Sequence, residues 1–122
     1  MPKYELEERT FQFAKKVREF IRKIPKDIAN IEDSKQVVRS SGSVGANYIE
    51  ANEALSKKDF QYRIKICRKE AKESMYWLKL ISVLSMQNLE KEKFELIKES
   101  EELKKIFSAI YNKSNAMNES TF

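Results

Sequence analysis

Six polar side chains recur at helical spacing in the middle of this sequence and could meet inside a helical protein. They are Arg39, Ser43, Asn47, Glu50, Glu70 and Glu73. Carboxylates that face one another in a helical bundle can hold a di-iron centre, but such centres also use Glu-x-x-His pairs, and the chain has no histidine. We therefore predict no metal site and no cofactor. We expect the six residues to form a polar network that fixes helix register, and the alternative is a ligand site.

The chain also lacks the groups that activate a nucleophile. A catalytic serine needs a base beside it, most often histidine. The single cysteine, Cys67, falls in an apolar helical stripe, so we expect a buried thiol that behaves as a small apolar side chain. The segment 42–45 has neither the lysine nor the glycine spacing of a phosphate-binding loop. We predict that the protein is not an enzyme.

Basic side chains gather in two segments of the chain. Seven lie between Arg9 and Lys26 against one acidic residue, and eight lie between Lys57 and Met86 against three. Such surfaces attract phosphate backbones, and no motif for reading base sequence is present. We expect RNA or DNA to bind without sequence preference, and the alternative is a lysine-rich face that only solvent contacts. The predicted contacts are Lys15, Lys16, Arg18, Arg22, Lys23, Lys65, Arg68, Lys72 and Lys79.

The elements that must position these side chains are helices. A chain of 122 residues suits one domain, and two glycines and two prolines are too few for the turns of a β-rich domain. Apolar spacing predicts helices over about 6–24, 34–55, 56–86 and 89–112. Short connections between them predict an all-α, antiparallel up-down-up-down four-helix bundle over residues 1–113 and a disordered tail over 114–122.

Cysteine usage and hydropathy indicate where such a chain works. One cysteine allows no internal disulfide, which fits a reducing compartment. The polar start of the chain does not look like a signal peptide, and no apolar run approaches the roughly 20 residues of a membrane span. We expect a cytoplasmic protein without membrane contact.

Two of the predicted helices carry two apolar stripes each. One stripe of the segment 34–55 includes Gly42 and Gly45, where small residues let another backbone come close. A helix of a monomeric bundle normally buries one stripe, so second stripes predict contact between copies of the chain. The alternative is one broad core. The predicted interface residues are Val37, Val44, Tyr48, Leu55, Tyr62, Ile66, Trp77, Leu80 and Leu84.

Motifs in the same two helices resemble a known family. The run 36–51, QVVRSSGSVGANYIEA, and the later Lys58-Asp59-Phe60, 69–74 (KEAKES) and Trp77-Leu78 are similar to the signature of four-helix-bundle proteins encoded by 23S ribosomal RNA intervening sequences. The resemblance implies a homopentamer without established enzymatic activity. That family is similar to the accessory variability protein of diversity-generating retroelements, a positively charged pentameric barrel that binds nucleic acid and partners a reverse transcriptase. The implied partners are further copies of the chain, RNA or DNA, and a second protein.

Overall fold

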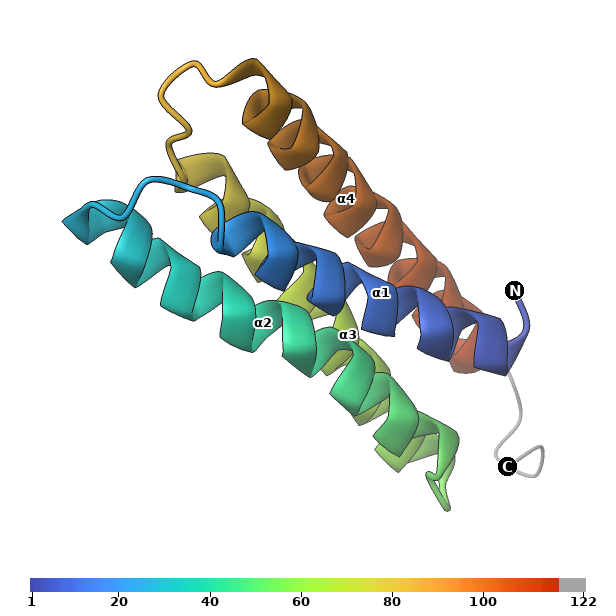
Figure 1. Ribbon diagram of the computed structural model, residues 1–122. Helices are drawn as coiled ribbons and strands as arrows, with labels where there is room; N and C mark the ends of the chain where they lie inside the picture. Colours follow the sequence, from blue (N-terminus) through green and yellow to red (C-terminus); the bar gives the residue numbers. More distant parts are fainter. Residues whose placement is uncertain (117–122) are drawn as a thin grey trace.

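A computed structural model describes residues 1–116 and contains four α-helices and no β-strand in that part of the chain (Figure 1). The helices are α1 (Lys3–Ile21), α2 (Ile28–Asn52), α3 (Lys57–Leu80) and α4 (Gln87–Asn115). This confirms the predicted all-α class and the four helices. Within the described residues, no helix has an apolar stretch long enough to cross a bilayer.

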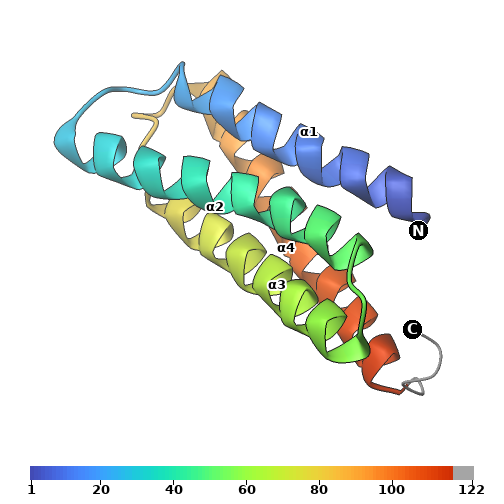
Figure 2. The ribbon, with the colours of Figure 1, turned by 90° about the horizontal axis from the view of Figure 1, so that it is seen from below.

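The helices pack in a closed cycle in which α1 contacts α2, α2 contacts α3, α3 contacts α4, and α4 returns to α1. The α1–α2 and α3–α4 connections lie at one end of the molecule, and the α2–α3 connection lies at the other (Figures 1 and 2). Residue numbers therefore rise along one helix as they fall along its neighbour. Thr10 of α1 lies against Gly45 of α2, for example, while Arg18 bonds to the backbone of Val38.

The core lies between the four helices and is built from the apolar stripe of each. The ring of Tyr48 on α2 meets the ring of Phe107 on α4 edge-on, with centroids 5.5 Å apart, so opposite helices also meet at the centre. Burial of such large side chains is the main favourable term in folding. The largest fully buried side chains are Leu6, Phe13, Val17, Phe20, Val37, Val44, Ile64, Leu78, Ile81, Val83, Leu103 and Phe107.

The helix α2 begins six residues before its predicted start at position 34. Asp27 caps it, because its carboxylate accepts a hydrogen bond from the backbone N–H of Asn30 at 2.8 Å. The segment 27–33, predicted as an irregular connection, is therefore largely the first turn and a half of α2. Ile28 and Ile31, which belong to this first part of α2, are exposed.

The helix α3 ends at Leu80, before the predicted end at position 86. Leu84 and Ser85 adopt left-handed backbone angles, with φ of 52° and 64°, which a right-handed helix cannot contain. The Asn30 side chain holds the connection: its amide donates to the Ser82 carbonyl at 2.8 Å and accepts from the Ser82 N–H at 3.0 Å. The buried Ile81 and Val83 explain why the connection looked like helix in the sequence.

The helix α4 begins at Gln87, two residues before its predicted start at position 89, and Met86 precedes its first turn. It continues to Asn115, and Ser114 is buried. The structured part therefore extends beyond position 113, where the predicted tail begins. The remainder of that tail, residues 117–122, lies outside the described residues.

Candidate nucleic-acid interface

The outer face of α3 carries a line of lysines. Lys58, Lys65, Lys72 and Lys79 are each seven residues apart and all exposed. Seven residues are close to two helical turns, so successive lysines lie about 10 Å apart, and the line drifts only about 20° around the helix per step. We call these four residues the lysine line. The structure thus brings the predicted contacts Lys65, Lys72 and Lys79 onto one face, and it adds Lys58.

The excess of positive over negative charge in this chain lies in α3. Eight of the 24 basic residues and three of the 19 acidic residues lie in this helix, so the rest of the chain holds 16 of each sign. The net charge of +5 is therefore the net charge of α3. A local excess of one sign acts on a polyanion more strongly than the same excess spread over a surface.

Two of the three acidic residues of α3 pair with a cation of α2 and not with the lysine line. Arg39 of α2 forms ion pairs at 3.5 Å with Glu70 and with Glu73. No ion pair within residues 1–116 involves a member of the lysine line. Lys65 of the line and the neighbouring Arg68 lie over the ring of Tyr111 on α4, with centroid distances of 4.9 and 5.7 Å. These cations are available to phosphate oxygens.

The predicted contacts on α1 have a different setting. Arg18 is half-buried and donates to the carbonyls of Ala14 at 3.0 Å and Val38 at 3.1 Å, so it ties α1 to α2. Lys23 pairs with Glu92 of α4 at 2.7 Å. Lys15, Lys16 and Arg22 are exposed. Lys23 is exposed as well, so four of the five predicted contacts in and just after α1 are open to solvent, and three of these four have no ion pair within residues 1–116.

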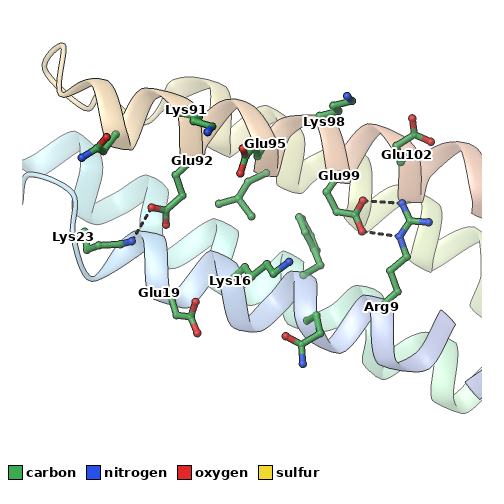
Figure 3. A pocket seen from close by; sticks show the side chains of 14 residues that line it. Arg9, Lys16, Glu19, Lys23, Lys91, Glu92, Glu95, Lys98, Glu99 and Glu102 are labelled. Carbon is green, nitrogen blue, oxygen red and sulfur yellow. Dashed lines mark hydrogen bonds and ion pairs between the residues drawn. The ribbon is translucent and has the colours of Figure 1, made fainter. Parts of the chain in front are cut away.

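A groove of about 1020 Å³ separates α1 from α4 (Figure 3). Arg9 bridges it through two hydrogen bonds of 2.7 Å to Glu99, and the Lys23–Glu92 pair bridges it further along. Its lining contains five basic and five acidic side chains, so it has no net formal charge and does not favour a phosphate. These are Arg9, Lys16, Lys23, Lys91 and Lys98 with Glu19, Glu92, Glu95, Glu99 and Glu102.

The predicted polar network forms between α2 and α3 around Glu70, which is buried. One Glu70 oxygen accepts from the hydroxyl of Ser43 at 3.4 Å and faces Arg39, while the other has no hydrogen-bond partner. Burial raises the pKa of Glu70, and the nearby carboxylate of Glu73 raises it further. The position of Glu70 between the helices therefore favours its neutral form.

A second part of the network was not predicted in full. Asn47 donates to the carbonyl and hydroxyl of Ser43 at 2.9 Å, and its own carbonyl accepts from Arg63 at 3.0 Å. Arg63 was missing from the prediction. Its position four residues before Cys67 places it on the side of α3 that faces α2, which could have indicated it. Glu50 is exposed, and none of the network contacts within residues 1–116 reaches it. Five of the six predicted residues are thus brought together.

Cys67 lies in the core, as its place in the apolar stripe indicated. Its thiol is fully buried and contacts the carbonyl of Val44 at 3.3 Å. Burial raises the pKa of this thiol to about 12, so almost no thiolate exists at neutral pH. In residues 1–116, no group of three or more metal-binding side chains comes together.

The predicted interface residues divide into two groups. Val37, Val44 and Tyr48 are buried inside the single chain, which corrects their assignment: a second copy cannot reach them, and they belong to the core. The large stripe of α2 faces the centre, and its small residues face α1. The other six are accessible on or next to α3, with Ile66 and Trp77 half-buried and the remaining four exposed: Leu55, Tyr62, Leu80 and Leu84.

Comparison with known proteins agrees with the motifs of α2 and α3. The model of the family described as 23S rRNA-intervening sequence protein matches residues 3–109. Among solved structures, the chain is similar to a protein of unknown function from the S23 ribosomal protein family of Bacteroides thetaiotaomicron VPI-5482, with 28% sequence identity and a TM-score of 0.72 over 86% of this chain and 96% of that one. No curated protein matches the chain. The chain belongs to the family of 23S rRNA-intervening sequence proteins.

Proposed function

We propose that this protein is a non-enzymatic nucleic-acid-binding bundle that holds RNA or DNA backbone on the outer face of α3, without base specificity. The observation that carries the proposal is the placement of charge. The whole net charge of +5 lies in α3, and the lysine line has no ion-pair partner within residues 1–116.

Phosphate contacts alone explain such a surface. Lysines that neutralise phosphates release condensed counterions, which gives affinity that falls steeply with salt and does not depend on base sequence. The lysine line extends from Lys58 to Lys79, about 30 Å at 1.5 Å per residue. A strand lying along α3 therefore meets several lysines in succession.

The test compares two charge-reversal variants of equal net charge. The first changes Lys65, Lys72 and Lys79 to Glu, and the control changes three exposed lysines of α4 to Glu: Lys91, Lys98 and Lys105. Each reversal removes two units, so both variants fall equally from +5. Fluorescence anisotropy with labelled RNA and DNA, over a range of salt, measures affinity.

We expect the α3 variant to lose binding and the α4 variant to keep most of it. Three lost phosphate contacts should also lower the slope of log affinity against log salt by about 2 for a single strand. Equal losses in the two variants would mean that only total charge matters. No binding of the wild type at low salt would end the proposal.

We further propose that the chain assembles with copies of itself, as a pentamer, which would multiply weak contacts through avidity. The exposed apolar residues at the ends of α3 support this, namely Leu55, Leu80 and Leu84. Light scattering of the wild type and of Leu80→Lys tests it, and we expect a lower mass in the variant with unchanged helicity. A wild type that stays monomeric favours instead an adaptor that docks another protein, such as a reverse transcriptase, through the second apolar stripe.

A further inference from the structure

A second groove, of about 630 Å³, lies between α2 and α3 next to the lysine line. That volume is within the range of roughly 300–1,000 Å³ typical of small-molecule sites. Its lining differs from that of the neutral groove between α1 and α4, since cations outnumber carboxylates and two aromatic rings are present. The lining residues are Gln36, Arg39, Lys69, Lys72, Glu73, Tyr76 and Trp77.

The two rings of this groove are adjacent but differ in burial. Trp77 is half-buried and packs against the core, whereas Tyr76 is 58% exposed. The rings lie nearly perpendicular, at 78°, with centroids 5.0 Å apart. Trp77 therefore gives Tyr76 a fixed neighbour while most of the Tyr76 ring stays open. An exposed aromatic ring among cations is typical of surfaces on which bases stack.

The polar groups around Tyr76 suit a base together with its phosphates. Lys69 and Lys72 are exposed and without ion pairs within residues 1–116. The Arg39 side chain is held only by contacts of 3.5 Å and is itself more than half exposed. The amide of Gln36 offers a donor and an acceptor, as the edge of a base requires. A flat heterocycle joined to an anion satisfies all of these groups.

We propose that the groove between α2 and α3 binds an unpaired nucleobase, stacked on Tyr76, while Lys69 and Lys72 contact the adjoining phosphates. The inference rests on the proposed function and adds a selectivity to it, because a base inside a duplex is already stacked and paired. The protein then prefers single-stranded RNA or DNA, or unpaired loops, over a blunt duplex of the same length. Stacking accepts any base, so this preference still involves no base sequence.

Trp77 lines the groove and is the only tryptophan of the chain, so its fluorescence reports binding there. Titration with short oligouridylate and oligothymidylate should change Trp77 fluorescence, and a blunt duplex should leave it nearly unchanged. The two oligonucleotides separate RNA from DNA as the source of the base. Tyr76→Ala should weaken single-strand binding roughly tenfold without changing duplex binding. Tyr4→Ala, which removes a 75% exposed ring from α1, is the matched control and should change neither.

The possible results distinguish failure of the base site from failure of the proposed nucleic-acid binding. The base site is refuted if the wild type binds single strands and duplexes with equal affinity and Tyr76→Ala keeps the wild-type affinity. If reversal of the lysine line then still abolishes binding, the proposed backbone binding stands. If no nucleic acid binds at low salt, both fall. If Tyr76→Ala lowers the mass in light scattering but leaves affinity unchanged, the groove is a contact between copies, and the base site is again refuted. Circular dichroism confirms that each variant is folded.

Discussion

Alanine substitution at Gly42 and at Gly45 should have opposite consequences, although both glycines lie on the face of α2 that packs on α1. A Cβ atom at Gly45 would lie 3.0 Å from the hydroxyl oxygen and 3.3 Å from the Cβ of Thr10. A Cβ atom at Gly42 would approach only the guanidinium of Arg18, at 3.1 Å. The two positions thus meet a rigid neighbour and a flexible one.

The magnitudes follow from what each neighbour can do. Glycine to alanine within a helix gains about 1 kcal/mol from backbone propensity. At Gly45, the β-branched side chain of Thr10 is buried, and its hydroxyl donates to the carbonyls of Leu6 and Glu7 at 3.0 and 2.9 Å, so it cannot rotate away. Overpacking then costs about 1–3 kcal/mol. We expect Gly45→Ala to lose about 1 kcal/mol net.

At Gly42, the close contact with an added Cβ atom is easier to relieve. The Arg18 guanidinium is the far end of a long side chain, and a small shift weakens its bond to the Val38 carbonyl while the bond to Ala14 can persist. Weakening one such bond costs about 0.5–1 kcal/mol, which the propensity gain offsets. We expect Gly42→Ala to be neutral or slightly stabilising, so the two variants should differ by at least about 1 kcal/mol.

Urea denaturation followed by circular dichroism measures this difference. With a slope of about 2 kcal/mol per molar urea for a small domain, 1 kcal/mol moves the midpoint by about 0.5 M. Thr10→Ala removes the nearest atom, so Gly45→Ala should be less harmful in that background, with a coupling of at least about 0.5 kcal/mol. If Gly45→Ala stabilises the protein as much as Gly42→Ala, then α1 and α2 are not in close contact at Thr10 and the reasoning is refuted.

Three further predictions concern buried groups. Folding raises the pKa of Glu70 from its ordinary 4.5, so the folded protein keeps a proton that the unfolded chain releases. Glu70 therefore adds to the free energy of unfolding below pH 4.5, and this contribution is lost as pH rises through the raised pKa. Glu70→Gln should remove this decline, measured as urea midpoints over a range of pH. Cys67, with a pKa of about 12, should resist thiol reagents at pH 8 in the folded protein and react in denaturant. Asn30→Ala should destabilise by about 2–4 kcal/mol, measured by urea, because it leaves polar groups of Pro25 and Ser82 unpaired.

Periodicity predicted that α2 has two apolar stripes but could not decide which one is buried. The stripe with Gly42 and Gly45 faces α1 and leaves Ile49 exposed, whereas the stripe with Val44 and Tyr48 fills the core. The reason is volume: the centre of a bundle needs large side chains, and a close helix pair needs small ones. Both stripes are buried to some degree by one chain, so part of the apolar surface assigned to self-association belongs to the fold.

Helix ends were predicted less well than helices because local chemistry sets them. The start of α2 depends on the single hydrogen bond between Asp27 and Asn30. The end of α3 is set by extended backbone at Ile81, and the connection that follows uses left-handed backbone at Leu84 and Ser85, residue types that rarely adopt it. Neither signal repeats along the chain, so neither is visible as a period.

In the candidate interface, too, features set by spacing along one helix were predicted, and features set by contacts between helices were not. The lysines of α3 were predicted because spacing alone places them on one face. The fate of Arg18 and Lys23 could not be predicted, because their partners lie 20 and 69 residues away in sequence. The groove between α2 and α3 was also missed, since Arg39 and Tyr76 meet there only after the helices pair.

The placement of charge decides between nucleic-acid binding and a merely solvated lysine-rich surface. Spacing alone does not decide this, because Lys91, Lys98 and Lys105 of α4 also recur every seven residues, but the six lysines of α4 are balanced by six glutamates. On α3, four lysines share this spacing, which keeps them on one side because the drift over three steps is only about 60°, and the helix has eight basic residues against three acidic ones. Two of the three acidic residues of the helix, Glu70 and Glu73, pair with Arg39 on its flank. Solubility requires no such separation, whereas a polyanion lying along the helix does, so reversal of the lysine line should matter more than an equal change of charge on α4.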